Sequence, residues 1–258
     1  SVTYLLSGLA RRVALRMGAV AQVRDRDVHS TPIPYFGGVA MLGGVAAAFL
    51  LADQLPFLGR HALVSHDARA ILLAGAVICA VGVLDDVLDL SAMAKAAGQL
   101  LAAGIVVSLG VRMYWIPLPN SIIALDPASS TLITVFLVFL CANAINFVDG
   151  LDGLASGVVA IGALAFFAYT YLLAYEQELV RATTASLVTV TVAGVCLGFL
   201  PHNFSPAKMF MGDSGALLLG LLMAASTISL TGQIDSSALT ASGGDLVPAY
   251  LPIVLPLA

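Results

Sequence analysis

Three polar stretches of the sequence adjoin long apolar runs, and each carries carboxylates or amides that could do chemistry. The longest covers residues 143–153 and reads N-A-I-N-F-V-D-G-L-D-G. Positions three apart in a helix differ by about 60° around its axis, so Asn143, Asn146 and Asp149 share one face, and Gly150 lets the backbone leave the helix. We expect polar atoms to converge there. The ordinary alternative is a polar loop end between two buried helices.

The second stretch is the pair Asp85 and Asp86, which follows the apolar run 70–84. Adjacent carboxylates at the C-terminal end of a helix oppose its macrodipole, so they are a poor structural cap. Ionised residues at membrane depth are costly and usually functional, which favours a functional role for the pair. Lys95 and Gln99 lie four apart on one face of the next predicted helix and point a cation and an amide toward the same end.

The third stretch reads F-M-G-D-S-G at 210–215 and brings Asp213 to the start of a helix. Asp213 could be an ordinary N-cap or a metal ligand. The three stretches offer hard oxygen donors without a cluster of thiolates or imidazoles, which suits Mg²⁺ completed by phosphate oxygens and water. The donors are Asp85, Asp86, Asn146, Asp149, Asp152 and Asp213.

Composition decides what kind of protein positions these groups. The chain of 258 residues is 60% hydrophobic and 10% charged, with a mean hydropathy of +1.00, so it has too few polar residues to cover a soluble globule. A net charge of -4 and the lack of a basic stripe with interleaved aromatics exclude a nucleic-acid binder. Cys79, Cys141 and Cys196 each stand alone in an apolar run, which suggests neither a disulfide framework nor a zinc site.

Apolar runs near the length of roughly 20 residues that crosses a bilayer predict an all-α, multi-pass transmembrane protein. The seven expected spans lie near 37–58, 68–84, 92–111, 129–149, 154–175, 182–200 and 214–232. Two shorter runs, 1–10 and 246–258, predict truncated first and last helices, about nine visible helices in all. We therefore expect one catalytic domain, 1–258, that is a fragment lacking both ends of a longer protein.

Alternate loops of such a protein lie on the same side of the membrane, and this places all three polar stretches on one face. Seven of the eleven Lys and Arg residues belong to that face, which predicts that it is cytoplasmic. They are Arg11, Arg12, Arg16, Arg24, Arg26, Lys95 and Lys208.

The motifs together resemble the polyprenyl-phosphate N-acetylhexosamine-1-phosphate transferase family, glycosyltransferase family 4. The matching stretches are G-V-L-D-D at 82–86 with Lys95 and Gln99, the stretch 143–153, and N-F-S-P-A-K-M-F-M-G-D-S-G at 203–215. Several residues between 26 and 38 also resemble the WecA and TagO branch of the family rather than the branch that handles muramyl-pentapeptide. They are Arg26, His29, Pro32, Pro34, Gly37 and Gly38.

The resemblance implies roles for particular side chains. Asp213 and Asn146 would hold Mg²⁺, for which Mn²⁺ could substitute, while Asp85 and Asp86 would be catalytic and serve the lipid phosphate and its deprotonation. The implied substrate-binding residues are Asp149, Asp152, Asn203, Phe210, Lys95, Arg26 and His29. The family's late cytoplasmic loop, which is rich in His and Arg and linked to sugar recognition, would lie beyond Ala258.

We therefore expect a membrane transferase that moves a sugar-1-phosphate from a UDP-sugar to polyprenyl phosphate. The favoured candidate for the transferred group is N-acetylglucosamine-1-phosphate. It would release UMP and initiate cell-envelope polysaccharide synthesis at the cytoplasmic face of a bacterial plasma membrane. The expected partners are the two substrates and membrane lipid, with no nucleic acid, and a homodimer is allowed. Asp85 or Asp86 could act as a base for direct attack by the lipid phosphate or as a nucleophile that forms an acyl phosphate.

Two other classes of protein share part of the pattern. A CDP-alcohol phosphotransferase also begins a motif with D-G and a nearby Ala, as in Asp149, Gly150 and Ala155, but its later glycine and paired aspartates do not follow here. An ion-coupled transporter also has carboxylates in its spans, yet it places them near the midplane, whereas these gather at one face.

Overall fold

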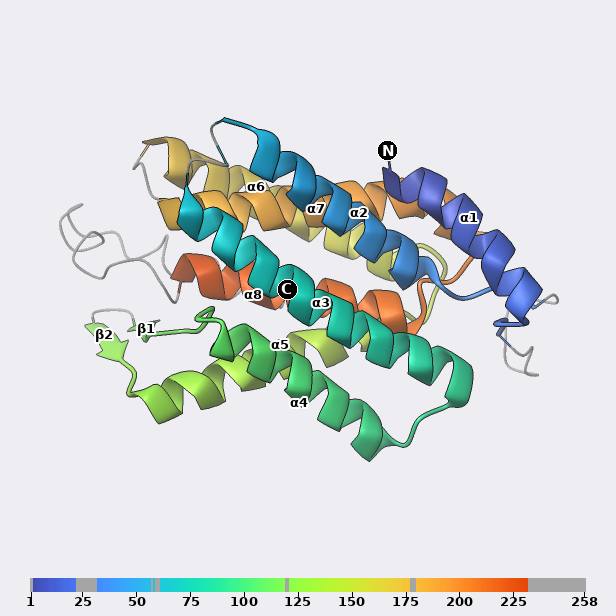
Figure 1. Cartoon of the computed structure of the whole chain (residues 1–258), viewed down its shortest axis with the longest axis horizontal. Helices are drawn as coiled ribbons and strands as arrows, with labels where there is room; N and C mark the ends of the chain where they lie inside the picture. Colours follow the sequence, from blue (N-terminus) through green and yellow to red (C-terminus); the bar gives the residue numbers. More distant parts are fainter. Residues whose placement is uncertain are drawn as a thin grey trace.

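A computed structural model of the chain describes residues 2–21, 32–56, 58, 61–118, 121–176 and 180–231. These residues form eight helices and one β-hairpin (Figure 1). The elements are α1 (Val2–Met17), α2 (Gly37–Gln54), α3 (Ala62–Leu88), α4 (Ala92–Ser108), β1 (Trp115–Leu118), β2 (Ser121–Ala124), α5 (Pro127–Val148), α6 (Leu154–Glu176), α7 (Val180–Asn203) and α8 (Gly212–Thr231).

Six of these helices are long and apolar enough to cross a bilayer, so the chain is a multi-pass membrane protein. They are α2, α3, α5, α6, α7 and α8. The predicted count of seven full spans is one too high, because α4 is 17 residues long and falls short. The described residues form eight helices where nine were expected, and the ninth, at 246–258, lies outside them.

Two further details differ from the prediction. The first helix continues past Arg11 and Arg12 to Met17, and Arg16 in its last turn interacts favourably with the negative end of the helix dipole. The fold is also not purely helical. β1 and β2 pair antiparallel with Trp115 opposite Ala124, in a segment rich in β-branched and aromatic residues that had been expected as a loop.

The core is organised around α8, whose spanning window is 94% buried. Glycines let its neighbours pack directly on its backbone: a Cβ added to Gly82 of α3 would overlap the backbone of Ser214, and one added to Gly220 would overlap the backbone of Ala142 in α5. In Figure 1, α8 runs between α3, α5 and α7. Because Gly82 stands one turn before Asp85 and Asp86, this close approach brings the aspartate pair to the start of α8.

The helical bundle has two ends, which differ in the helix termini and loops that they hold. One end, the polar end, holds the ends of α3, α5 and α7 and the starts of α4, α6 and α8, with the three polar stretches. The hairpin precedes α5 at the other end, which also holds the end of α2 and the start of α3 (Figure 1). Cys79, Cys141 and Cys196 are free and buried.

Candidate active site

Asp86 joins the end of α3 to the start of α8. Its Oδ1 accepts the backbone N–H of Asp213 over 2.8 Å, and its Oδ2 accepts that of Ser214 over 3.3 Å. A carboxylate at this position satisfies N–H groups that a helix start leaves unpaired and interacts favourably with its dipole. Gly212, with φ of 67°, has no room for a side chain because the Asp86 carboxylate fills that space. Asp213 is therefore not the cap of its own helix; Asp86 supplies that cap.

Asp85 lies beside Asp86 and faces a different set of partners. Its Oδ1 accepts the N–H of Leu90 over 2.9 Å, and its Oδ2 lies 3.1 Å from the Lys95 ammonium. α3 ends here because Asp89 takes a left-handed φ of 52°, which an Asp tolerates better than most residues. The turn directs Asp85 toward α4, where Ser91 caps the first turn by accepting the N–H of Ala94.

Lys95 connects four helices at the polar end. Its ammonium contacts Asp85 of α3 and also forms an ion pair with Asp213 of α8. The amide oxygen of Asn146, in α5, accepts from the same ammonium over 3.1 Å, while the amide nitrogen donates to Asp213 Oδ1 over 2.9 Å. One cation thus stands among three aspartates, counting Asp86, so the cluster keeps an excess of negative charge. We call Asp85, Lys95, Asn146 and Asp213 the charge cluster.

A pair of amides holds α4 against α5 behind the charge cluster. Gln99, which is 1% exposed, accepts from Asn143 Nδ2 over 2.6 Å and donates back over 3.4 Å. Asn143 also donates to the carbonyl of Phe139 over 2.7 Å. Gln99 lies one turn from Lys95, and Asn143 lies one turn from Asn146, so the amide pair sets where both cluster residues stand. The predicted convergence of an amide and a cation from α4 is confirmed.

Asp149 directly follows the last residue of α5. In the described part of the chain its side chain has no hydrogen bond or ion pair. Burial raises the pKa of Asp149 to about 7, and the nearby negative charge of Asp86 adds to the rise. A half-buried carboxyl that titrates near neutrality with no protein partner is a candidate for contact with a ligand.

The remaining predicted residues hold the loops around this end. Asn203, 2% exposed, accepts the N–H of Gly153 over 3.1 Å and donates to the carbonyl of Met209 over 3.1 Å. Asp152 accepts the N–H of Ala207 over 2.9 Å. These two side chains link the loop before α6 to the loop before α8.

Phe210 connects the latter loop to the segment before α2. Its N–H donates to the carbonyl of Pro34 over 3.0 Å, its carbonyl accepts the N–H of Gly37 over 3.2 Å, and its ring lies 6.3 Å from that of Tyr35. Gly37 and Gly38 pack against the segment around Met211, so they serve as packing sites. Arg26 and His29 lie outside the described residues.

A model of the family described as glycosyl transferase family 4 matches residues 68–231. The chain belongs to glycosyl transferase family 4. All the cluster residues, Asp86 and Asp149 fall within the matched range, and so do the amide pair and the loop residues that surround them.

Curated members of the family are similar along most of the chain. Decaprenyl-phosphate N-acetylglucosaminephosphotransferase of Mycobacterium tuberculosis (strain CDC 1551 / Oshkosh) is 45% identical over 92% of this chain and 60% of the relative. A probable undecaprenyl-phosphate N-acetylglucosaminyl 1-phosphate transferase of Bacillus subtilis (strain 168) is 35% identical over 90% and 60%. Phospho-N-acetylmuramoyl-pentapeptide-transferase of Desulforudis audaxviator is 32% identical over 89% and 71%. The chain thus spans 60% of the length of the first two.

Sequence reasoning named most of the residues that meet at the polar end but missed two arrangements. It did not foresee that Asp86 caps α8, because Asp86 and Asp213 lie 127 residues apart and only the packing at Gly82 brings them together. It also gave Lys95 no partners. The spacing of Lys95 and Gln99 on one face of α4 was the signal that could have paired them with Asn146 and Asn143, which share a face of α5.

Proposed function

We propose that the protein transfers N-acetylglucosamine-1-phosphate from a UDP-sugar to a polyprenyl phosphate and releases UMP. The observation that carries the proposal is the charge cluster, in which side chains from four helices meet at one end of a membrane protein of this family. The names and the 45% and 35% identity of the curated relatives support the polyprenyl phosphate acceptor and the sugar. The excess of Lys and Arg at the polar end supports a cytoplasmic active face.

The donor set of the cluster fits a divalent cation of the Mg²⁺ type. The Asn146 amide atom that faces Asp213 lies 2.9 Å from Asp213 Oδ1. Asp213 and Asn146 each carry a side-chain oxygen of the hard type that Mg²⁺ prefers, so these two side chains would hold the cation. No group of three or more His, Cys, Asp or Glu residues in the described ranges could hold a metal, so substrate phosphates and water would supply the remaining ligands.

Asp213 and Asn146 are therefore the residues we assign to Mg²⁺, or to Mn²⁺ in its place. When bound, the cation would neutralise the charge of the diphosphate, which is the main requirement of phosphoryl transfer. Lys95 would leave its ion pair with Asp213 and offer its ammonium to a phosphate oxygen. Without substrate, Lys95 lies beside both Asp85 and Asp213. With substrate and metal bound, Lys95 would stay near Asp85 and the metal cation would take its place beside Asp213.

The two adjacent aspartates receive different roles. Both oxygens of Asp86 accept backbone N–H groups of α8, which supports a positioning role. Asp85 shares its second oxygen with Lys95 and is the carboxylate that we assign to the lipid phosphate. Asp149, which has no partner in the described part of the chain, would contact the UDP-sugar. Asn203 and Asp152, whose bonds close the surrounding loops, would shape the donor pocket.

We favour direct attack over a covalent enzyme intermediate. An oxygen of the lipid phosphate forms a bond to the sugar-side phosphorus while the bond from that phosphorus to the oxygen of UMP breaks, and UMP leaves. A phosphate monoester with a second pKa of about 6 is already largely a dianion at neutral pH, so it needs placement more than deprotonation. Exchange of labelled UMP into UDP-sugar by lipid-free protein, at a rate comparable with turnover, would establish the covalent route instead.

The direct test of the proposal is an assay with purified protein, UDP-N-acetylglucosamine and polyprenyl phosphate. We expect UMP and a lipid diphospho-sugar in equal amounts, only when the lipid is present. Excess chelator should stop the reaction, and added Mg²⁺ should restore it. Absence of UMP with both substrates and Mg²⁺ would reject the function, whereas full activity in chelator would reject only the metal assignment.

A further inference from the structure

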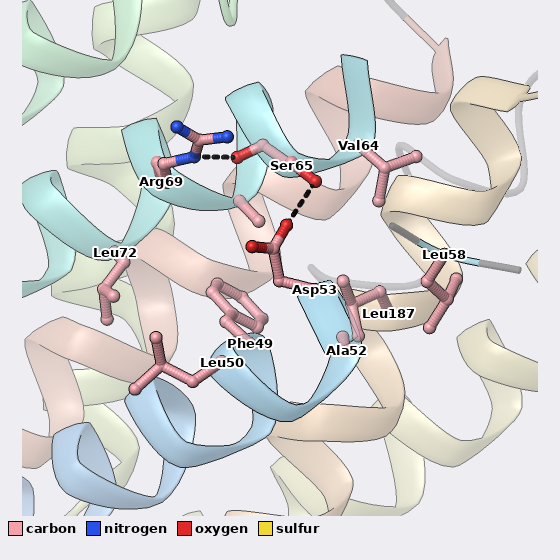
Figure 2. A pocket seen from close by; sticks show the side chains of 11 residues that line it. Phe49, Leu50, Ala52, Asp53, Leu58, Val64, Ser65, Arg69, Leu72 and Leu187 are labelled. Atoms are coloured by element: carbon pink, nitrogen blue, oxygen red, sulfur yellow. Dashed lines mark hydrogen bonds between the residues drawn. The ribbon is translucent and has the colours of Figure 1, made fainter. Parts of the chain in front are cut away.

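A cavity of about 100 Å³ lies at the end of the bundle opposite the charge cluster (Figure 2). It is open on one side and is lined by the end of α2, by Leu58 of the following loop, by the start of α3 and by Leu187 of α7. Most of its walls are apolar side chains, among them Phe49, Leu50, Val64, Leu72 and Leu187. Leu50 is 67% exposed, so the apolar wall continues onto the outer surface of the bundle, which lipid covers in a membrane protein.

One edge of the cavity carries two opposite charges, Asp53 and Arg69, which both contact Ser65. Ser65 donates its hydroxyl to Asp53 Oδ1 over 2.7 Å, and Arg69 donates Nε–H to the carbonyl of Ser65 over 3.1 Å, as Figure 2 shows. Asp53 and Arg69 are both exposed, and among the described residues neither has another hydrogen bond or an ion pair. Within that part of the chain, one Asp53 carboxylate oxygen and the terminal guanidinium nitrogens of Arg69 have no protein partner.

The depth of this edge matches the level of lipid headgroups. Arg69 and Asp85 stand 16 residues apart in α3, which corresponds to about 24 Å along the helix. The hydrocarbon core of a bilayer is about 30 Å thick, so when Asp85 lies at one interface the Arg69 backbone lies about 6 Å inside the other, a distance that its long side chain spans. Phe49 and Leu72 stand one turn closer to the bilayer centre than Asp53 and Arg69, respectively. The apolar cavity therefore lies at acyl-chain depth beneath a charged edge.

We propose that this cavity binds a membrane phospholipid with a zwitterionic headgroup that carries a primary amine, of the phosphatidylethanolamine type. The upper part of one acyl chain would enter the cavity. The guanidinium of Arg69 binds the phosphate, and the carboxylate of Asp53 accepts N–H bonds from the ammonium. A trimethylammonium headgroup has no N–H to donate, and an anionic headgroup without an amine would place its charge beside Asp53, so both fit less well.

Native mass spectrometry of the detergent-purified protein tests the proposal. The lipids are phosphatidylethanolamine, phosphatidylcholine and phosphatidylglycerol with identical chains, offered in equal amounts. We expect phosphatidylethanolamine to be retained roughly tenfold over phosphatidylcholine, the effect of one charge-assisted hydrogen-bond set. Asp53→Asn should remove this preference, and Arg69→Gln should lower retention of all three lipids. Asp126→Asn, which removes a charge at the same end but away from the cavity, should retain the preference.

Three outcomes would overturn the proposal. They are equal retention of the ethanolamine and choline lipids by the unchanged protein, an unchanged preference in Asp53→Asn, and tighter retention of phosphatidylglycerol than of phosphatidylethanolamine. Both charged side chains are exposed, so their substitution should leave the fold intact, and melting temperatures will verify this. Ala68→Leu supplies a second readout because it fills the apolar wall and should reduce binding of all three lipids.

Discussion

The two ends of the bundle handle charge in opposite ways. At the polar end, Asp85, Lys95 and Asp213 come from three different helices and depend on one another. At the other end, Asp126 accepts bonds from Ala128 and Ser129 in the first turn of its own helix. Locally satisfied charges serve folding, whereas a cluster that only the complete fold can assemble is suited to bind a charged substrate.

The largest difference in turnover is expected between variants of two cationic side chains, Lys95 at the polar end of the bundle and Arg69 at the other end. Lys95→Met should lower turnover at least about 100-fold, because it removes a preorganised positive charge from the site where phosphate is handled. Arg69→Met, at the other end, should leave turnover unchanged. The measurement is kcat for UMP release with both substrates saturating. Equal losses in the two variants would remove the distinction between the ends.

The packing glycines at the polar end give the next largest effect. Gly82→Ala should destabilise the protein by roughly 1–3 kcal/mol, because its Cβ would overlap the backbone at the start of α8. Gly104→Ala in α4 meets nothing within 4 Å and should be neutral or stabilising by up to about 1 kcal/mol. Thermal unfolding in detergent compares them. A Gly82→Ala protein as stable as the original would show that the close approach is not required.

The amide pair should affect the reaction more than the fold. Gln99→Leu leaves Asn143 without its buried partner and loosens the register of α4 on α5, so kcat should fall about tenfold with little change in KM. At the other end, Thr134→Val removes the hydroxyl that accepts the N–H of Met113 over 2.9 Å, and it should lower the melting temperature without changing kcat. Gln99→Leu and Asn143→Leu should not be additive when combined. Additive losses would show that the two amides act separately.

The smallest effects concern stability against pH, and they should have opposite signs at the two ends. The pKa of Asp149 is raised to about 7, so the stability contributed by its protonated form is lost as pH rises through about 7. The Asp149→Asn variant should therefore gain melting temperature relative to the original protein between pH 5 and pH 8, by roughly 2–4 °C at the higher pH.

At the other end, the hydrogen bond from the Ser129 hydroxyl lowers the pKa of Asp126. The stability contributed by the ionised form is present above the ordinary pKa and is lost as pH falls through the lowered one. Asp126→Ala should therefore melt below the original protein at pH 7 and approach it under acidic conditions. The same trend with pH in both variants would contradict this contrast.

The sequence predicted most of the helices and the gathering of the three polar stretches at one end of the bundle, because apolar runs of bilayer length leave few alternatives. It also predicted that Asp85, Asn146 and Asp213 share one face. It did not predict the hairpin at Trp115, which depends on pairing between strands, or the extra turns of α1. The cap that Asp86 supplies to α8 was equally hidden, since it follows from backbone contact between helices far apart in the chain.

One matched pair of substitutions tests the central claim, that the charge cluster is the site of sugar-phosphate transfer. Asp213 and Asp126 both stand at helix starts, at opposite ends of the bundle. With UDP-N-acetylglucosamine, polyprenyl phosphate and Mg²⁺, UMP formation per folded molecule should be abolished in Asp213→Asn and unchanged in Asp126→Asn. Normal UMP formation by folded Asp213→Asn would contradict the account.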